Sequence, residues 1–214
     1  MAITPQRHRR HTGLRAFTLI ELLVVTAIIV VVTGIILADN NRFGGVVQLE
    51  NLAYDVALSI RQAQVYGISV ARFSTASVCA GQPQSSNFCS GYGMHFDIRD
   101  PQHYEFFADV SGNGLYDPSE NVPPSPYTIA NGFKISALCT TPPVGTESCG
   151  ATAIDVVFKR PEPDAWISAG GASCILSNGP CEEGARIVLT SPRGDTMSVV
   201  VEVNGQISVV HGAQ

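Results

Sequence analysis

The sequence predicts an α+β protein in which a long apolar N-terminal helix precedes an amphipathic helix packed on an antiparallel β-sheet domain. Three observations support this fold class. An apolar run covers residues 17–38, helically spaced apolar residues cover 49–63, and alternating patterns bounded by turn residues follow. Because strands and helices do not alternate after residue 68, we expect an antiparallel sheet.

The apolar run, FTLIELLVVTAIIVVVTGIILA, contains one ionisable side chain, that of Glu21. As a helix it would extend about 33 Å, enough to cross the hydrocarbon core of a bilayer. Four arginines precede it, so we expect residues 1–16 to stay cytoplasmic and the rest to be exported. The predicted parts are therefore a leader (1–16), a transmembrane and assembly helix (17–45) and an exported head (46–214).

Glu21 lies at the fifth position of the apolar run. A carboxylate at the centre of a membrane helix costs about 2.5–3.5 kcal/mol and needs a partner. The alternative is an ordinary signal peptide or single-pass anchor. An ordinary signal peptide has a shorter apolar core and small residues at its cleavage site, whereas this run is long and ends in Ile36-Leu37-Ala38.

Ala16 followed by FTLIELLV resembles the processing site of type IV prepilins and type II secretion pseudopilins. This resemblance implies cleavage between Ala16 and Phe17 by a prepilin peptidase, which also methylates the new N-terminus. It further implies that Glu21 is the family's glutamate at mature position five. The family usually has Gly before the cut; Ala is the nearest small substitute, so we expect processing here and leave its rate open.

The chemistry is consistent with assembly through the helix. Cleavage would expose a cationic amine at Phe17, and Glu21 of a neighbouring helix could neutralise it. Two charges that are each costly in lipid are tolerated as a pair, which favours staggered packing of helices. The expected partners are other pilins or pseudopilins, the prepilin peptidase and the inner membrane. The protein would span that membrane once before joining a filament, with its head in the periplasm or outside the cell.

The rest of the chain resembles, more loosely, the GspH/FimT-type minor pseudopilins and minor pilins. The shared outline is a helix containing ALSIRQAQ, a strand, a Cys-bearing loop and a closing β-meander. It implies a structural subunit of a type II secretion pseudopilus or a type IV pilus, between which the sequence does not decide. The alternative is a tip adhesin or a DNA-uptake module on the same stem.

The composition weighs against DNA binding. Removing the four leader arginines leaves nine basic residues against 18 acidic ones, a formal charge of −9 compared with −5 for the whole chain. An acidic surface repels phosphate backbones, so we expect no binding to DNA. No catalytic motif is recognisable, so we expect no enzymatic activity.

Six cysteines lie outside the apolar run, at separations that suggest pairing of sequence neighbours. An even count in an exported domain favours disulfides, although 15 connectivities are possible. The candidates are Cys79, Cys89, Cys139, Cys149, Cys174 and Cys181.

The segment 109–120, DVSGNGLYDPSE, matches much of the twelve-residue calcium-loop template. Its turn glycine stands at position 6, and oxygen ligands of Ca²⁺ are expected at positions 1, 3, 5, 7, 9 and 12. These are Asp109, Ser111, Asn113, the backbone carbonyl of Leu115, Asp117 and Glu120. Because the preceding residues have a strand pattern, the loop would be isolated and its ion structural. A Gly/Asn/Asp-rich turn that binds no metal uses the same residues and is the alternative.

Eight strands are expected in the head, with a kink or break of the stem after residue 38. The strands are 68–78, 91–98, 104–108, 127–138, 154–159, 186–190, 196–203 and 206–210. Asn204-Gly205 predicts a hairpin turn with positive φ at both central residues, and 191–195 predicts a second turn. Segments 118–126 and 161–180 are expected to be long loops, the second with Trp166 as a core anchor.

Overall fold

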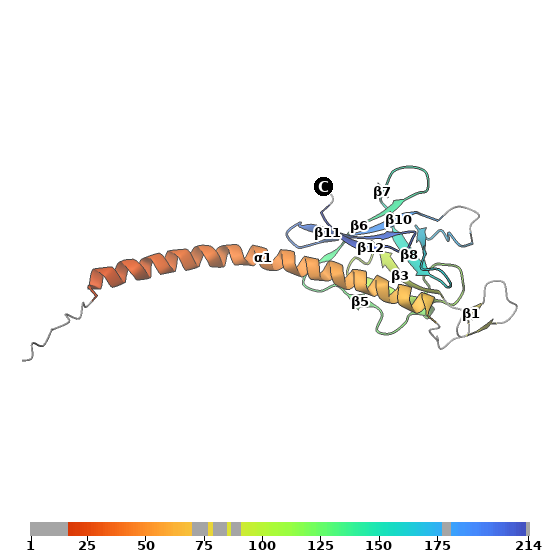
Figure 1. The fold of residues 1–214 in the computed structure, drawn as a ribbon, viewed down its shortest axis with the longest axis horizontal. Coiled ribbons are helices and arrows are strands. Elements are labelled where there is room, and N and C mark those ends of the chain that lie inside the picture. The colour runs from red at the N-terminus through yellow and green to blue at the C-terminus, as the bar shows by residue number, and fades with distance from the viewer. Residues whose placement is uncertain (1–16, 70–76, 79–84, 87–90, 177–180, 213–214) are drawn as a thin grey trace, which may run out of the picture. The chain divides into compact units, whose positions relative to one another are not determined.

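The computed structural model describes residues 17–69, 77–78, 85–86, 91–176 and 181–212, without the side chains of 38–43, 77–78 and 85–86. The chain divides into two compact units, 1–43 and 44–214. The fold class is α+β, as the sequence predicts: an N-terminal apolar helix is followed by a helical segment packed on antiparallel sheets (Figure 1).

Helix α1 spans Leu19–Ile68, so the two predicted helices are two segments of one assigned element. The backbone at 39–45 is helical, so the expected break of the stem is wrong, and the expected kink stays a prediction. The segment contains Gly44 and Gly45 but no proline. A glycine weakens a helix by only about 1 kcal/mol, whereas proline would remove a hydrogen bond and clash with the preceding turn.

The second segment of α1 buries one apolar stripe in the head. Its members recur at intervals of three and four residues, which places them on one helix face. They are Leu49, Ala53, Val56, Ile60 and Ala63, all in the hydrophobic core.

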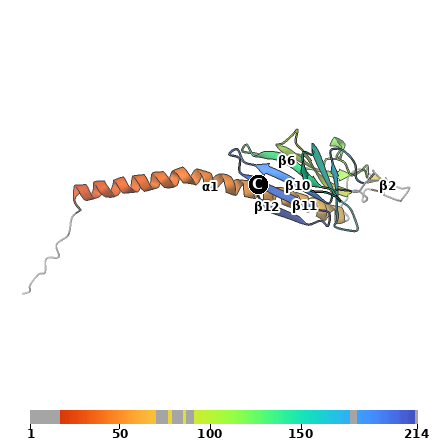
Figure 2. The same ribbon diagram turned by 90° about the horizontal axis from the view of Figure 1, so that it is seen from above.

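The described strands form two five-stranded antiparallel sheets and a two-stranded ribbon. The first sheet has the order β12-β11-β10-β6-β7 and the second β5-β4-β3-β8-β9; the ribbon pairs β1 with β2. Figure 2 shows β6, β10, β11 and β12 side by side. The strand bounds are β1 Ser77–Val78, β2 Ser85–Ser86, β3 Gly91–Asp97, β4 His103–Asp109, β5 Tyr127–Thr128, β6 Lys134–Thr141, β7 Ser148–Cys149, β8 Ala153–Phe158, β9 Ala165–Ala169, β10 Gly184–Thr190, β11 Thr196–Glu202 and β12 Ile207–His211.

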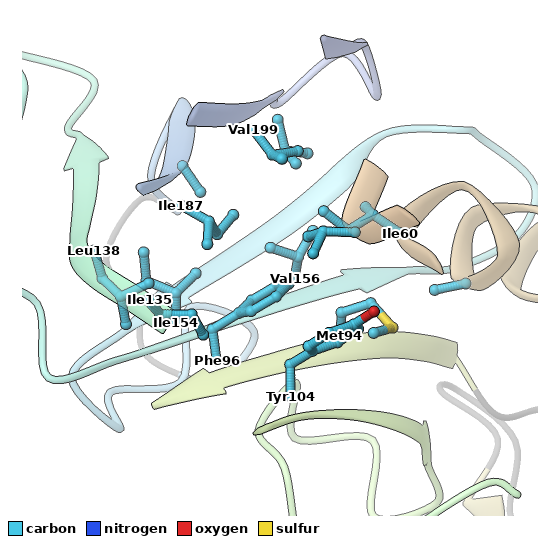
Figure 3. Packing of buried hydrophobic residues seen from close by; sticks show 14 of the residues in the cluster. Ile60, Met94, Phe96, Tyr104, Ile135, Leu138, Ile154, Val156, Ile187 and Val199 are labelled. Carbon is cyan, nitrogen blue, oxygen red and sulfur yellow. The ribbon is translucent and has the colours of Figure 1, made fainter. Parts of the chain in front are cut away.

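One core joins the helix to both sheets. Figure 3 shows Ile60 of α1 near Val156 of β8 and Val199 of β11, with Phe96 and Ile154 between the sheets. Because side chains alternate along a strand, the other face of β3 and β8 points away from this core. That outer face carries His95 and Asp155, which pair across the two strands.

Two strand predictions and one loop prediction differ from the structure. The predicted strand 68–78 is wrong at its start, where α1 continues to Ile68 and a turn follows at Ser69; β1 covers Ser77–Val78, and 70–76 lie outside the described residues. The predicted strand 127–138 is divided into β5 and β6 by Asn131 and Gly132, both with positive φ, and the two strands join different sheets. The predicted loop 161–180 contains β9, which pairs with β8 and holds Trp166 at 41% exposure instead of in the core.

Both predicted hairpin turns are present, but one has a different geometry. Between β11 and β12, Gly205 has φ 79° and its amide donates to the Glu202 carbonyl at 2.8 Å. Among described residues, Asn131 is the only non-glycine with positive φ, so Asn204 lacks the expected conformation. The turn therefore resembles the three-residue loop in which a left-handed glycine follows a type I turn.

Candidate functional site

The N-terminal candidate site begins at Phe17, since Ala16 lies outside the described residues. Phe17 is 75% exposed. Thr18 Oγ1 accepts a hydrogen bond from the Glu21 amide at 3.3 Å, and the Thr18 carbonyl accepts one from the Leu22 amide at 3.2 Å. Thr18 therefore caps the start of α1, and Glu21 is the acidic residue of its first turn.

The hydrogen bond of this cap uses the main-chain amide of Glu21, and the two residues also match a pattern in which the Glu side chain contributes to the cap. A Thr followed three residues later by Glu is the pattern of a capping box. A carboxylate in the first turn also interacts favourably with the helix dipole. The sequence Thr18-Leu-Ile-Glu21 contains this capping-box pattern. Two different interactions could thus require Glu21, one within the helix and one with another chain.

The segment Leu19–Leu37 of α1 is long and apolar enough to cross a membrane, with a mean hydropathy of 2.9. None of this segment is buried within the protein. Its hydroxyl group at Thr26 donates to the carbonyls of Leu22 and Leu23, both at 3.0 Å. An apolar surface of this extent requires lipid or other apolar helices as its surroundings.

Two of the three expected disulfides are present, Cys139–Cys149 and Cys174–Cys181. Cys139 and Cys149 are directly opposite each other on β6 and β7. The remaining candidates, Cys79 and Cys89, lie outside the described residues. Disulfides persist in oxidising compartments, so these two bonds indicate a head located outside the cytoplasm.

The 109–120 loop brings two of its carboxylates together in a buried position. Asp109, at the end of β4, is 2% exposed, and Glu120, at the end of the 3₁₀ helix Pro118–Glu120, is 4% exposed. The two carboxylates meet at Ser111. Its hydroxyl donates to Asp109 Oδ1 at 3.3 Å, and its amide donates to Glu120 Oε1 at 2.9 Å.

Each carboxylate also accepts main-chain hydrogen bonds. Asp109 accepts from the amides of Asn113 and Gly114, both at 3.0 Å. Glu120 Oε1 accepts from the amide of Val110 at 3.0 Å. Burial raises the pKa of both carboxyl groups, and the charge of Asp109 raises the pKa of Glu120 further. The fold thus holds two acidic groups at a site where negative charge is unfavourable.

Asp117, the ligand predicted at position 9, does not join this pair. Its side chain is exposed, and its Oδ1 accepts from the Ser119 amide at 2.9 Å, capping the 3₁₀ helix. Asn113 Oδ1 is likewise engaged, with the Leu115 amide at 2.7 Å. Within the described ranges, no group of three or more His, Cys, Asp or Glu side chains is placed to hold a metal ion.

The loop is fixed to the outer face of the second sheet. The Tyr116 ring stacks on His95 with centroids 4.6 Å apart, and its amide donates to Asp155 Oδ1 at 3.2 Å. The same Asp155 oxygen lies 2.7 Å from His95 Nδ1. The Ser173 hydroxyl donates to the Asn113 carbonyl, which ties the loop to the segment after β9. Asp155 cannot be identified from the sequence, because its strand pattern gives no sign of the distant loop that it contacts.

No protein-family model, curated protein or solved structure matches this chain. Its architecture, a long apolar N-terminal helix followed by antiparallel β-sheets, is nevertheless consistent with that of pilin-like proteins.

Proposed function

We propose that this chain is a minor pilin or pseudopilin, a non-enzymatic structural subunit of a type IV pilus or a type II secretion pseudopilus. A prepilin peptidase would remove residues 1–16 and methylate the amine of Phe17. The subunit would span the inner membrane before assembly and would then be incorporated into a filament, where α1 contacts other pilins. The observation that carries this proposal is Glu21 on an apolar helix with no buried face, directly after a basic leader.

Glu21 supports assembly because its charge needs compensation. Within lipid, a lone carboxylate and a lone amine are each costly, whereas the two together form a tolerated pair. The amine exposed at Phe17 of one subunit would supply the positive charge for Glu21 of the next. The two disulfides of the head support export, which a filament subunit requires.

A role of Glu21 in the helix cap is an alternative to its role in charge pairing between subunits. One pair of variants distinguishes these two roles. Glu21→Gln removes the charge but preserves the capping box, in which Gln serves as well as Glu. Thr18→Ala removes the capping hydroxyl and keeps the charge. If assembly depends on charge, Glu21→Gln should reduce incorporation at least about tenfold, equivalent to about 1.4 kcal/mol. Thr18→Ala should have a much smaller effect.

The assay uses the full chain expressed with its prepilin peptidase and the filament proteins of its own organism. Sheared filaments are probed for the subunit, and the membrane fraction shows whether each variant is inserted and cleaved. N-terminal sequencing of the processed parent should begin at Phe17. A different start, or Glu21→Gln subunits entering filaments as readily as the parent, would contradict the proposal.

A further inference from the structure

The 109–120 loop contains a buried carboxylate oxygen that the fold leaves without a hydrogen-bond donor. Within the described part of the chain, Glu120 Oε2 is buried and has no hydrogen-bond partner. Its companion Oε1 accepts from the amides of Val110 and Ser111, which fixes the carboxylate at the start of the loop beside Asp109. A buried ionised oxygen without a donor or a cation is strongly unfavourable.

The immediate surroundings add negative charge to this oxygen. The Asp109 carboxylate is linked to Glu120 through Ser111, whose hydroxyl donates to Asp109 Oδ1 at 3.3 Å and whose amide donates to Glu120 Oε1 at 2.9 Å. The two acidic residues are the first and last of the twelve-residue segment, and Ser111 contacts both carboxylates. The carboxylates of Asp109 and Glu120 and the hydroxyl of Ser111 offer oxygen atoms only, which are the ligands preferred by hard cations.

We infer that this loop binds one Ca²⁺ ion through Asp109, Ser111 and Glu120. These are positions 1, 3 and 12 of a calcium loop, and Gly114 at position 6 has the positive φ, 72°, of a sharp turn. The ion supplies the positive charge that Glu120 Oε2 lacks and offsets the repulsion between the two carboxylates. Main-chain carbonyls and water complete its coordination, since Ca²⁺ accepts six to eight oxygens in flexible geometry.

The structure also corrects which acidic residues take part. The sequence template includes Asp117, whereas the fold uses that side chain as the cap of the 3₁₀ helix. A Ca²⁺ ion bound at the two ends of the loop would stabilise the conformation that places Tyr116 on His95. All residues of the site belong to the head of a single chain, so calcium binding can be measured apart from filament assembly.

The test is a calcium titration of the full chain in detergent after treatment with chelator. Calorimetry measures the dissociation constant, and thermal unfolding measures the stabilisation. At about 100 times the dissociation constant, Ca²⁺ should raise the Tm by roughly 5–10 °C. Glu120→Gln should weaken binding at least about tenfold while still folding in chelator, since it removes a buried charge and preserves shape.

Asp117→Asn is the matched control. Asn caps a helix as well as Asp, and the fold keeps this side chain away from the carboxylate pair, so calcium affinity should stay within about twofold of the parent. Asp109→Asn provides a second variant that should lose affinity. The inference is overturned if the parent shows no calcium response up to millimolar concentration, or if Glu120→Gln binds as tightly as the parent. Equal losses in Asp117→Asn and Glu120→Gln would also overturn it. None of these results depends on the proposed role in a filament.

Discussion

Gly67 offers the sharpest test of how the helical segment of the head packs on the second sheet. This residue is buried near the end of α1, directly against Phe158 of β8. A Cβ atom added there would lie 2.8 Å from the Phe158 carbonyl carbon and 2.9 Å from its Cβ, and closer still to its carbonyl oxygen. Carbon atoms normally pack at about 3.5–4.0 Å, so Gly67→Ala must displace the helix end by roughly 0.6 Å or more.

The displaced contact involves main chain, which cannot rotate away as a flexible side chain can. Overpacking of this kind costs about 1–3 kcal/mol, and the helix propensity of Ala recovers little of it at a helix end. For a domain of this size each kcal/mol corresponds to about 2–4 °C, so we expect a Tm lower by roughly 2–12 °C. The assay is thermal unfolding of the full chain in detergent, followed by circular dichroism.

Gly45→Ala is the control, because it makes the same change in the same helix where a Cβ meets nothing within 4 Å. There the gain in helix propensity, up to about 1 kcal/mol, should raise the Tm by about 2–4 °C. Opposite signs for the two substitutions are the expected result. If Gly67→Ala melts at or above the parent temperature, the close approach of α1 to β8 is refuted.

Two further changes probe the head. Gln64 is buried, and its Nε2 donates to the carbonyls of Pro163 at 2.9 Å and Gly205 at 3.0 Å; Gln64→Ala should therefore cost about 2–3 kcal/mol in denaturant unfolding, and Gln62→Ala much less. Burial raises the pKa of the Glu105 carboxyl in the folded protein above its usual value of 4.5. The contribution of this carboxyl to stability is therefore complete below pH 4.5 and is lost as the pH rises through the folded-state pKa. Glu105→Gln should accordingly match the parent in Tm near pH 4 and exceed it increasingly towards pH 7; a difference that stays constant with pH would contradict this.

The sequence alone was sufficient for features whose signal lies within one segment. The apolar run, the stripe from Leu49 to Ala63 and the two C-terminal hairpins are examples, because helix and strand periods and turn residues are local properties. The pairing of Cys139 with Cys149 and of Cys174 with Cys181 was also predictable, since short loops favour pairing of sequence neighbours. For the same reason, the acidic residues of the 109–120 loop could be recognised as a candidate cation site from their spacing.

Tertiary structure decided everything that depends on segments far apart in the chain. It assigned β9 to the edge beside β8, although its flanking prolines and glycines suggested a loop. It placed the left-handed Asn in the turn at 131–132, where the chain passes from one sheet to the other, and not at 204–205. Above all, it separated Asp117 from Asp109 and Glu120. Spacing shows which oxygens can meet. Which of them do is determined by burial and by competing hydrogen bonds, such as the one that Asp117 accepts from the Ser119 amide as a helix cap.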